Sequence, residues 1–398
     1  MHPPRYLGLL LGLALPSGLL AAEPYRPRSA DTVLLQRAPG AAKAVREARP
    51  AQKASDPVAR AAAAQAAIEL ARRSGDPRYF GQAQALLAAD WTAAEPALAT
   101  RLVRATLRQQ RHDFEGAKTD LAAVLAADPR NAQAHLMRAS IALAQGQPQS
   151  ARADCAALIG NAGLLVAATC LGSANALRGQ AASGLQAIEV ALARDTQAAA
   201  TLRLWALTQA AEIAERLGDV PRAAEHFAQA LALAESSGEN DVYLQAAYAD
   251  FLLQQERAAE VVPLLSGKTD FDPLLLRLAL AQAQLAAKGD AKAQGAAALH
   301  LKDLLARFAL AQSRGDVAHL REQAMTALHL QAAPARALAL AEANWAEQRE
   351  PADALLLLQT AIAAGNAAAA KPVLDWLQQT GIEDVRLRPL AAQLALKS

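Results

Sequence analysis

The chain has 398 residues, of which 53% are hydrophobic but only 4% aromatic. Alanine and leucine therefore supply most of the apolar surface, which favours closely packed helices over strands rich in β-branched and aromatic residues. The 40 Lys and Arg side chains nearly balance the 38 Asp and Glu side chains, leaving a formal net charge of +2. This balance gives no indication of nucleic-acid binding. We predict an all-α protein without a nucleic-acid partner.

The first 22 residues have the layout of a secretory signal peptide. Arg5 precedes an apolar run over residues 7–15, and a Pro-Ser-Gly break leads to small residues ending at Ala22. The apolar run is too short to cross a membrane, and no later run of about 18 uninterrupted apolar residues follows. We predict cleavage after Ala22, export to a bacterial periplasm and no integral membrane span.

Residues 23–56 form a proline-rich segment. Repeated prolines interrupt regular structure, so this segment is predicted to be an extended leader. As an alternative, Thr32–Gln36 docks on the rest of the protein as a strap, although terminal segments are usually loose.

From residue 57 onwards, small residues recur in a fixed frame around three glycines that each end a helical run, Gly146, Gly179 and Gly218. Small residues lie seven positions before these glycines (Ala139, Gly172, Ala211) and five positions after them (Ala151, Gly184, Ala223). His112 replaces the glycine one unit earlier, between Ala105 and Ala117. Two helices approach closely only where side chains are small, so the frame predicts a repeated helix crossing.

The second helix of each unit also keeps an apolar stripe. Its members are Leu121, Cys155, Ile188 and Phe227, followed three residues later by Val124, Leu158, Ala191 and Ala230. This i, i+4, i+7 pattern marks one face of a helix. The units are spaced by 34, 33 and 39 residues, and such drift is typical of loop insertions in a solenoid.

The sequence "AAEHF" (223–227) and the turn "DPRN" (128–131) resemble the tetratricopeptide repeat (TPR), although the Trp and Tyr usual in its first helix are mostly replaced. The resemblance, to uncharacterised secreted bacterial TPR proteins, implies an α-solenoid over residues 57–398. We place its helix pairs near residues 57–90, 98–130, 132–162, 163–197, 200–237, 240–268, 272–315, 316–350 and 351–381, with a closing helix from Asp384.

No motif for catalysis or for a cofactor is present. The histidines form no dense metal signature, and there is neither a phosphate-binding loop nor a G-x-S-x-G turn. The four tryptophans, Trp91, Trp205, Trp345 and Trp376, are scattered over distant units. We predict no enzyme activity, no cofactor and no metal. One alternative is an envelope-glycan hydrolase, which would gather acids and aromatic rings in a cleft; another is a self-associating structural assembly factor.

The two cysteines lie at similar distances from one predicted turn, Cys155 before it and Cys170 after it. Antiparallel packing brings them level, which predicts a disulfide between neighbouring repeats in an oxidising compartment. In the alternative, both are small buried apolar residues.

Four arginines, Arg101, Arg104, Arg108 and Arg111, follow one another at spacings of three, four and three. They share one helix face, which suggests binding of an anionic partner through paired hydrogen bonds. A solvated or packed row is the alternative, because Arg104 recurs as Arg138 one repeat later.

The TPR resemblance implies a scaffold or adaptor that binds a protein or peptide in a concave groove lined by first helices. Trp205 and Tyr248 are candidate groove aromatics, although aromatic residues at helical spacing often belong to the core. The partner is unidentified, and the protein is predicted to be a monomer or to self-associate weakly.

Overall fold

A computed structural model describes residues 56–398, apart from residues 75, 77, 314–318 and 396–398. The described residues all belong to one structural unit, 46–398. The predicted signal peptide, the leader and the Thr32–Gln36 strap lie outside the described residues.

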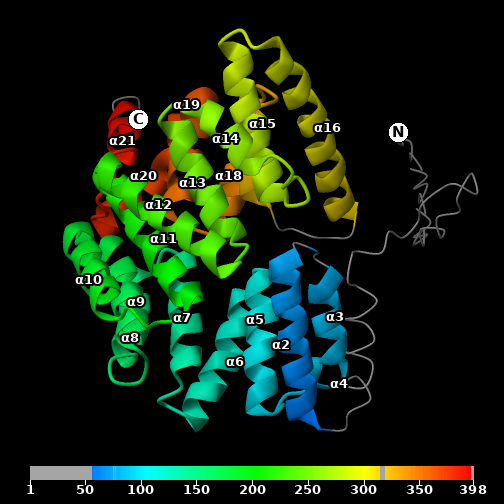
Figure 1. The fold of residues 1–398 in the computed structure, drawn as a ribbon, viewed down its shortest axis with the longest axis vertical. Coiled ribbons are helices and arrows are strands. Elements are labelled where there is room, and N and C mark those ends of the chain that lie inside the picture. Colours follow the sequence, from blue (N-terminus) through cyan, green and yellow to red (C-terminus); the bar gives the residue numbers. More distant parts are fainter. Residues whose placement is uncertain (1–55, 75, 77, 314–318, 396–398) are drawn as a thin grey trace, which may run out of the picture. The chain divides into compact units, whose positions relative to one another are not determined.

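Nine consecutive helix pairs make up the described chain (Figure 1). They are α2 (Pro57–Ser74) with α3 (Arg78–Leu86), α5 (Leu98–Gln110) with α6 (Phe114–Ala127), α7 (Ala132–Ala144) with α8 (Pro148–Ala157), α9 (Leu164–Ala176) with α10 (Ala181–Arg194), α11 (Ala200–Leu217) with α12 (Val220–Ser237), α13 (Val242–Gln254) with α14 (Ala258–Leu265), α15 (Asp272–Ala287) with α16 (Ala291–Ser313), α17 (Leu320–His329) with α18 (Pro334–Glu347), and α19 (Pro351–Ala363) with α20 (Lys371–Thr380).

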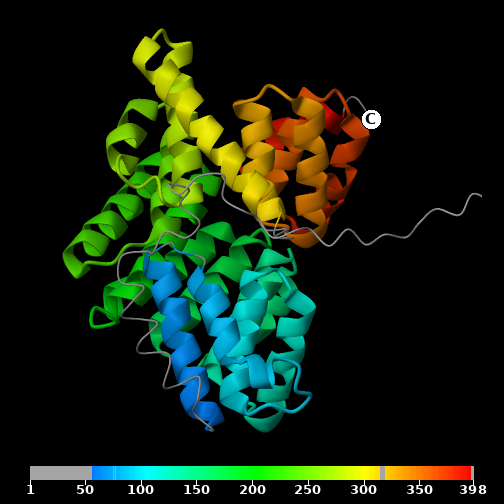
Figure 2. The same cartoon turned by 90° about the vertical axis from the view of Figure 1, so that its right-hand side faces the viewer.

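Three short elements complete the chain: α4 (Ala88–Trp91) after the first pair, a 3-10 turn at Ala367–Ala370 before α20, and the closing helix α21 (Leu387–Ala395). The described residues contain no strand. The all-α solenoid of TPR-like helix pairs is confirmed. One pair departs from the repeat length, because α16 extends over 23 residues alongside α15 (Figure 2).

The turn between the two helices of a pair has a left-handed residue at the predicted position. The backbone angle φ is 65° at Gly146, 69° at Gly179 and 80° at Gly218, and His112 takes the same conformation at 59°. A residue with a side chain adopts this conformation at some cost, whereas glycine does not. The repeat frame is therefore correct, including the replacement of a turn glycine by His112.

The predicted helix crossing is closest between Gly172 of α9 and Gly184 of α10. A Cβ atom added at Gly184 would lie 2.5 Å from the Gly172 carbonyl oxygen, and one at Gly172 would lie 2.7 Å from the Gly184 oxygen. The backbones themselves are in contact, so neither position has room for a methyl group. The apolar stripe of the second helices is also buried, with every member at most 1% exposed.

We expect Gly184→Ala to lower the free energy of unfolding by about 1–3 kcal/mol, because the new methyl group overpacks a backbone contact. Gly295→Ala is the matched control, since Gly295 lies inside α16 with no atom within 4 Å of an added Cβ. That variant should gain about 0.5–1 kcal/mol from helix propensity alone. Urea unfolding followed by circular dichroism measures both; a stabilising effect at both positions would contradict the close crossing.

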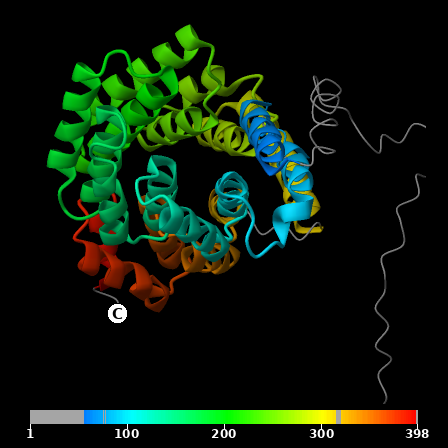
Figure 3. The ribbon, with the colours of Figure 1, turned by 90° about the horizontal axis from the view of Figure 1, so that it is seen from below.

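The C-terminal pairs pack against the turns of the middle repeats (Figure 3). Leu177, at the end of α9, is buried in the same hydrophobic cluster as Trp345 and Trp376. The Arg349 amide donates to the Ala144 carbonyl at 2.7 Å, and the Trp376 indole donates to the Gly146 carbonyl at 3.2 Å. Segments about 200 residues apart in sequence thus form one core.

The segment that follows α20 continues this contact along two more turns. The Ala181 amide donates to the Glu383 carboxylate at 2.9 Å, and the Val385 amide donates to the Arg216 carbonyl at 2.9 Å. A Cβ added at Gly179 would lie 2.7 Å from the Gly381 carbonyl oxygen. We call residues 381–386 the C-terminal clasp. The sequence analysis did not predict it.

Candidate functional site

A row of polar side chains runs along five successive first helices. It occupies the position directly after the small crossing residue of α5, α7, α9, α11 and α13. We call these residues the polar row: Thr106, Ser140, Ser173, Glu212 and Asp250. Repeat solenoids present extended surfaces on which partners can bind, so a polar row that recurs along the repeats is a candidate functional site.

Members of the polar row bond to the neighbouring first helix. The Ser173 hydroxyl donates to the Gln209 side chain at 2.9 Å, and the Tyr243 hydroxyl donates to Glu212 at 2.6 Å. The Arg277 guanidinium donates to both oxygens of Asp250, at 3.0 and 2.7 Å. The row therefore ties adjacent repeats together with polar groups where an ordinary core would be apolar.

Tyr243, which donates to Glu212 of the polar row, is exposed. Its side chain is 58% exposed, although Val242 before it and Leu244 after it are partly or fully buried. Water therefore reaches the first helices at α13. The sequence analysis did not select Tyr243, because nothing in the sequence separates an exposed aromatic residue from one in the core. The hydrogen bond from its hydroxyl to Glu212 on α11 is visible only in the structure.

A charged cluster surrounds Glu212 and includes the C-terminal clasp. Its carboxylates are Glu212, Glu215, Asp250, Glu322, Glu350, Asp353 and Asp384, and its guanidinium groups are Arg216, Arg277, Arg321 and Arg386. Arg386 bonds to Asp384 at 2.7 Å and to Glu215 at 2.9 Å. Arg321 bonds to Asp353 and to Glu350, each at 2.5 Å. The cluster joins α11, α13, α15, α17, α19 and the clasp.

Burial and neighbouring carboxylates shift most ionisable groups in the cluster toward the protonated form. Burial raises the pKa of Glu215 to about 7, with Arg386 opposing and Glu212 and Asp384 adding to the rise. Burial likewise raises the pKa of Glu212. For Arg321, burial lowers the pKa, but Asp353 and Glu350 more than reverse this and leave it well above its usual value.

Two groups in the cluster shift the other way. Burial raises the pKa of Glu322, but Arg277 and Arg321 outweigh it and leave that pKa below its usual value. Burial lowers the pKa of Arg216, and the attraction of Glu212 and Asp384 only partly compensates. The cluster as a whole still has more carboxylates than guanidinium groups.

We expect Glu215→Gln to change how stability depends on pH. The folded-state pKa of Glu215, about 7, exceeds its unfolded value near 4.5, so its contribution is fully present below pH 4.5 and is lost as pH rises through 7. Glutamine mimics the protonated form at every pH. The variant should have a melting temperature higher by a few degrees at pH 8 and equal to wild type at pH 4.5; a gap that is constant with pH would contradict the assignment.

The arginine row lies on one face of α5, as the spacing predicts, but it is engaged within the protein. Arg104 is 4% exposed and bonds to both oxygens of the fully buried Asp120, at 2.7 and 2.5 Å. Arg108 bonds to the same carboxylate at 2.7 Å, and Arg101 lies 3.6 Å from it. Arg111 donates to the Gln84 side chain at 2.9 Å.

These contacts favour the packing alternative over the hypothesis that the row binds an anionic partner. One carboxylate and several backbone carbonyls already take up the guanidinium donors, and Arg104 is closed to an incoming ligand. The pair recurs one repeat later, where Arg138 bonds to both oxygens of Asp154 at 2.8 and 2.6 Å. The packing alternative, with its recurrence at Arg138, describes these residues.

The structure brings the two cysteines together across the α8–α9 turn as a disulfide. The Cys155 and Cys170 sulfur atoms are 1.96 Å apart and their Cα atoms 5.4 Å apart. Both residues are at most 1% exposed. The neighbouring repeats are linked in the way that antiparallel packing predicts.

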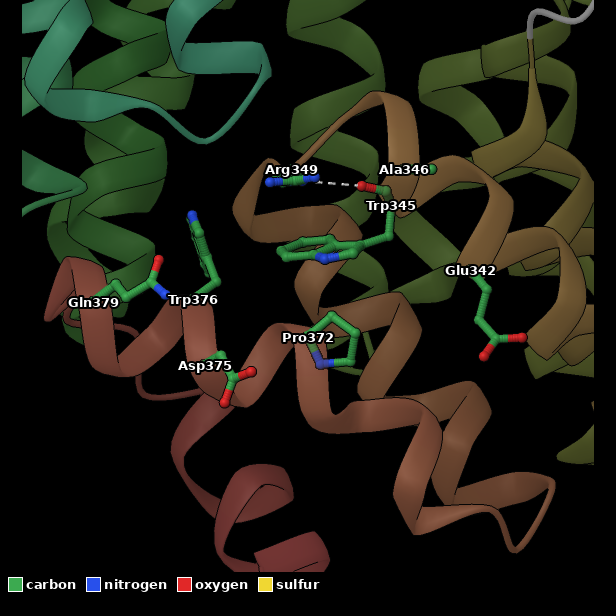
Figure 4. Close-up of a pocket in the computed structure, with 8 residues that line it drawn as sticks. All are labelled: Glu342, Trp345, Ala346, Arg349, Pro372, Asp375, Trp376 and Gln379. Carbon is green, nitrogen blue, oxygen red and sulfur yellow. Dashed lines mark hydrogen bonds between the residues drawn. The ribbon is translucent and has the colours of Figure 1, made fainter.

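Two of the tryptophans are not scattered. The Trp345 and Trp376 rings meet edge to face with centroids 5.5 Å apart, and they line a pocket of about 390 Å³ that also contains Glu342 and Asp375 (Figure 4). Both indoles are only 5% exposed, and Asp375 is ion-paired with Lys371 at 2.8 Å. Because both rings are nearly buried, they offer little open face on which a sugar could stack.

The two candidate groove aromatics have packing roles. Tyr248 stacks against Phe251 with ring centroids 6.1 Å apart and lies 5.4 Å from Phe227. Trp205 packs against the hydrophobic cluster around the disulfide. These contacts are those of the core alternative, although both side chains are only partly buried.

Within the described ranges, no group of three or more His, Cys, Asp or Glu side chains is arranged to hold a metal ion. None of the described helices combines the length and the apolar character that crossing a membrane requires.

No protein-family model matches this chain, and no curated protein sequence is found to match it. Among solved structures, a tetratricopeptide repeat protein from Parabacteroides merdae ATCC 43184 is similar, with 17% identity, a TM-score of 0.40 and coverage of 61% of this chain and 92% of that chain. The TPR domain of P58(IPK) is also similar, at 16% identity and a TM-score of 0.24, covering 84% of this chain and 98% of that one.

Proposed function

We propose that this protein is an exported, non-catalytic scaffold that binds a protein or peptide along its first helices. The observation that carries the proposal is the polar row, which places hydrogen-bonding groups at the same position of the first helices of five successive pairs and ends beside the exposed ring of Tyr243.

A partner bound along the row would make many weak contacts spread over several repeats, and would not depend on a single deep pocket. Repeat surfaces bind extended or helical segments in this way, because each repeat contributes a few side chains at a regular spacing. Ser140 and Tyr243 are exposed on α7 and α13, so accessible contact points lie three repeats apart. Removing one contact should therefore weaken binding without abolishing it.

The proposal is tested in cells that export the full chain with a photo-crosslinking amino acid at position 243. Gln229 is the matched control, because it is exposed on α12, the second helix of the preceding pair. We expect a discrete protein adduct from position 243 and none from position 229. Equal adducts from the two positions, or none from position 243, would overturn binding at the first helices.

A further inference from the structure

The charged cluster has a surplus of negative charge. It contains seven carboxylates and four guanidinium groups, and most of the guanidinium groups already form ion pairs within the cluster. Arg386 pairs with Asp384, Arg277 with Asp250, and Arg321 with Asp353 and Glu350. Glu215 shares Arg386 with Asp384, and Glu322 is stabilised in its charged form by Arg277 and Arg321. Among the described residues of the cluster, Glu212 is therefore the carboxylate left without a guanidinium partner.

No cation of the described residues is in direct contact with Glu212. Its two carboxylate oxygens accept hydrogen bonds from the Tyr243 hydroxyl at 2.6 Å and from the Gln209 amide at 2.7 Å. Both donors are neutral, so they orient the carboxylate without compensating its charge. A partner cation at this point would gain a charge-assisted hydrogen bond that the protein itself does not supply.

Glu215 provides a second, independent observation. It is 9% exposed, its Oε2 accepts from Arg386 at 2.9 Å, and its Oε1 has no hydrogen-bond partner. A buried carboxylate oxygen without a donor is costly and calls for an explanation. Glu215 lies three residues after Glu212 on α11 and therefore on the same side of that helix. The buried Arg216 also has an unpaired Nε, and it is included in the charge count.

We infer that the first helices at α11 and α13 receive a basic segment of the partner, whose lysine or arginine cation donates to Glu212 and lies against the ring of Tyr243, with the buried carboxylate of Glu215 adding to the attraction. This inference rests on the proposed function and adds the chemistry of the partner. A cation beside an aromatic ring and two carboxylates gains from both interactions. An acidic segment would meet like charge and be rejected.

The test measures binding of fluorescein-labelled octalysine and octaglutamate to the folded chain by fluorescence polarisation at fixed salt. We expect octalysine to bind and octaglutamate not to bind. The double variant Glu212→Gln/Glu215→Gln should weaken octalysine binding at least tenfold. The control Glu225→Gln/Glu235→Gln removes the same charge from exposed positions of α12 and should change binding by less than twofold.

A second variant keeps the inference testable if the double variant misfolds. Tyr243→Leu removes an exposed ring and should weaken octalysine binding about threefold through loss of the cation–ring contact. The inference is overturned if octaglutamate binds as well as octalysine, if the α12 control loses as much affinity as the α11 variant, or if wild type does not bind octalysine. It is also overturned, with the proposed function intact, if the segment crosslinked from position 243 contains no lysine or arginine.

Discussion

Asp120→Ala is expected to lower the free energy of unfolding by about 3–5 kcal/mol. Asp120 is fully buried and receives hydrogen bonds from Arg104 and Arg108, while Arg101 lies within ion-pair distance. Its removal leaves the guanidinium of Arg104, itself 4% exposed, without its carboxylate, and an uncompensated buried charge costs this much in other proteins. The backbone carbonyls of Asp90, Trp91 and Ala93 satisfy the remaining donors but do not neutralise the charge.

Glu115→Ala provides the control for this change. It removes a carboxylate from the same helix, but the Glu115 side chain is 81% exposed and pairs with Lys118 on the surface. Such a pair contributes at most about 0.5 kcal/mol. Denaturant unfolding measures both variants, and comparable losses would show that Asp120 does not organise the arginine row.

The second large effect is expected when the disulfide is removed. Replacing Cys155 and Cys170 together by alanine should lower stability by about 3 kcal/mol, because the unfolded chain regains the freedom of a loop of 15 residues. Reduction of the wild type should cost a similar amount. The alanine variant should be insensitive to reductant, which separates the effect of the bond from that of lost packing.

The state of the two thiols in the exported protein can be measured directly. Protein isolated without reductant and then denatured should show no reactive thiol. Two reactive thiols per chain would mean that Cys155 and Cys170 act as small buried residues, and the alanine variant should then match wild type closely.

Much of the fold could be predicted from the sequence, because the geometry of a repeat protein depends on residues that are close together in the chain. The glycines that end the first helices adopt left-handed conformations, and the small residues around them lie where helices cross. Each of these features depends on residues within about 35 positions of one another. That frame, with the helical periodicity and the TPR resemblance, predicted nine helix pairs.

The arginine row shows where the local pattern was insufficient. The spacing of Arg101, Arg104 and Arg108 correctly predicts a shared helix face, but it gives no information about the opposite helix. No pattern in the sequence showed that Asp120, on the opposite helix, lies at the centre of the row. The equivalent pairing of Arg138 with Asp154, again sixteen residues apart, was the signal that would have identified both pairs.

The charged cluster and the C-terminal clasp could not be predicted for a different reason. Their contacts join residues that no repeat period relates, such as Glu215 with Arg386 and Gly146 with Trp376. Gly179 was correctly interpreted as a turn residue, yet it also allows the close approach of Gly381. The polar row, by contrast, could have been predicted from the sequence, because each of its residues directly follows the small crossing residue of a first helix.

The central claim is that the first helices act as one extended binding surface, and photo-crosslinking from two distant repeats tests it most directly. Probes at Ser140 on α7 and at Tyr243 on α13 would be compared with probes at Arg152 on α8 and at Gln229 on α12; all four positions are exposed. We predict that both first-helix positions crosslink to the same protein and that neither second-helix position does. Adducts from the second-helix positions alone, or different proteins from Ser140 and Tyr243, would contradict it.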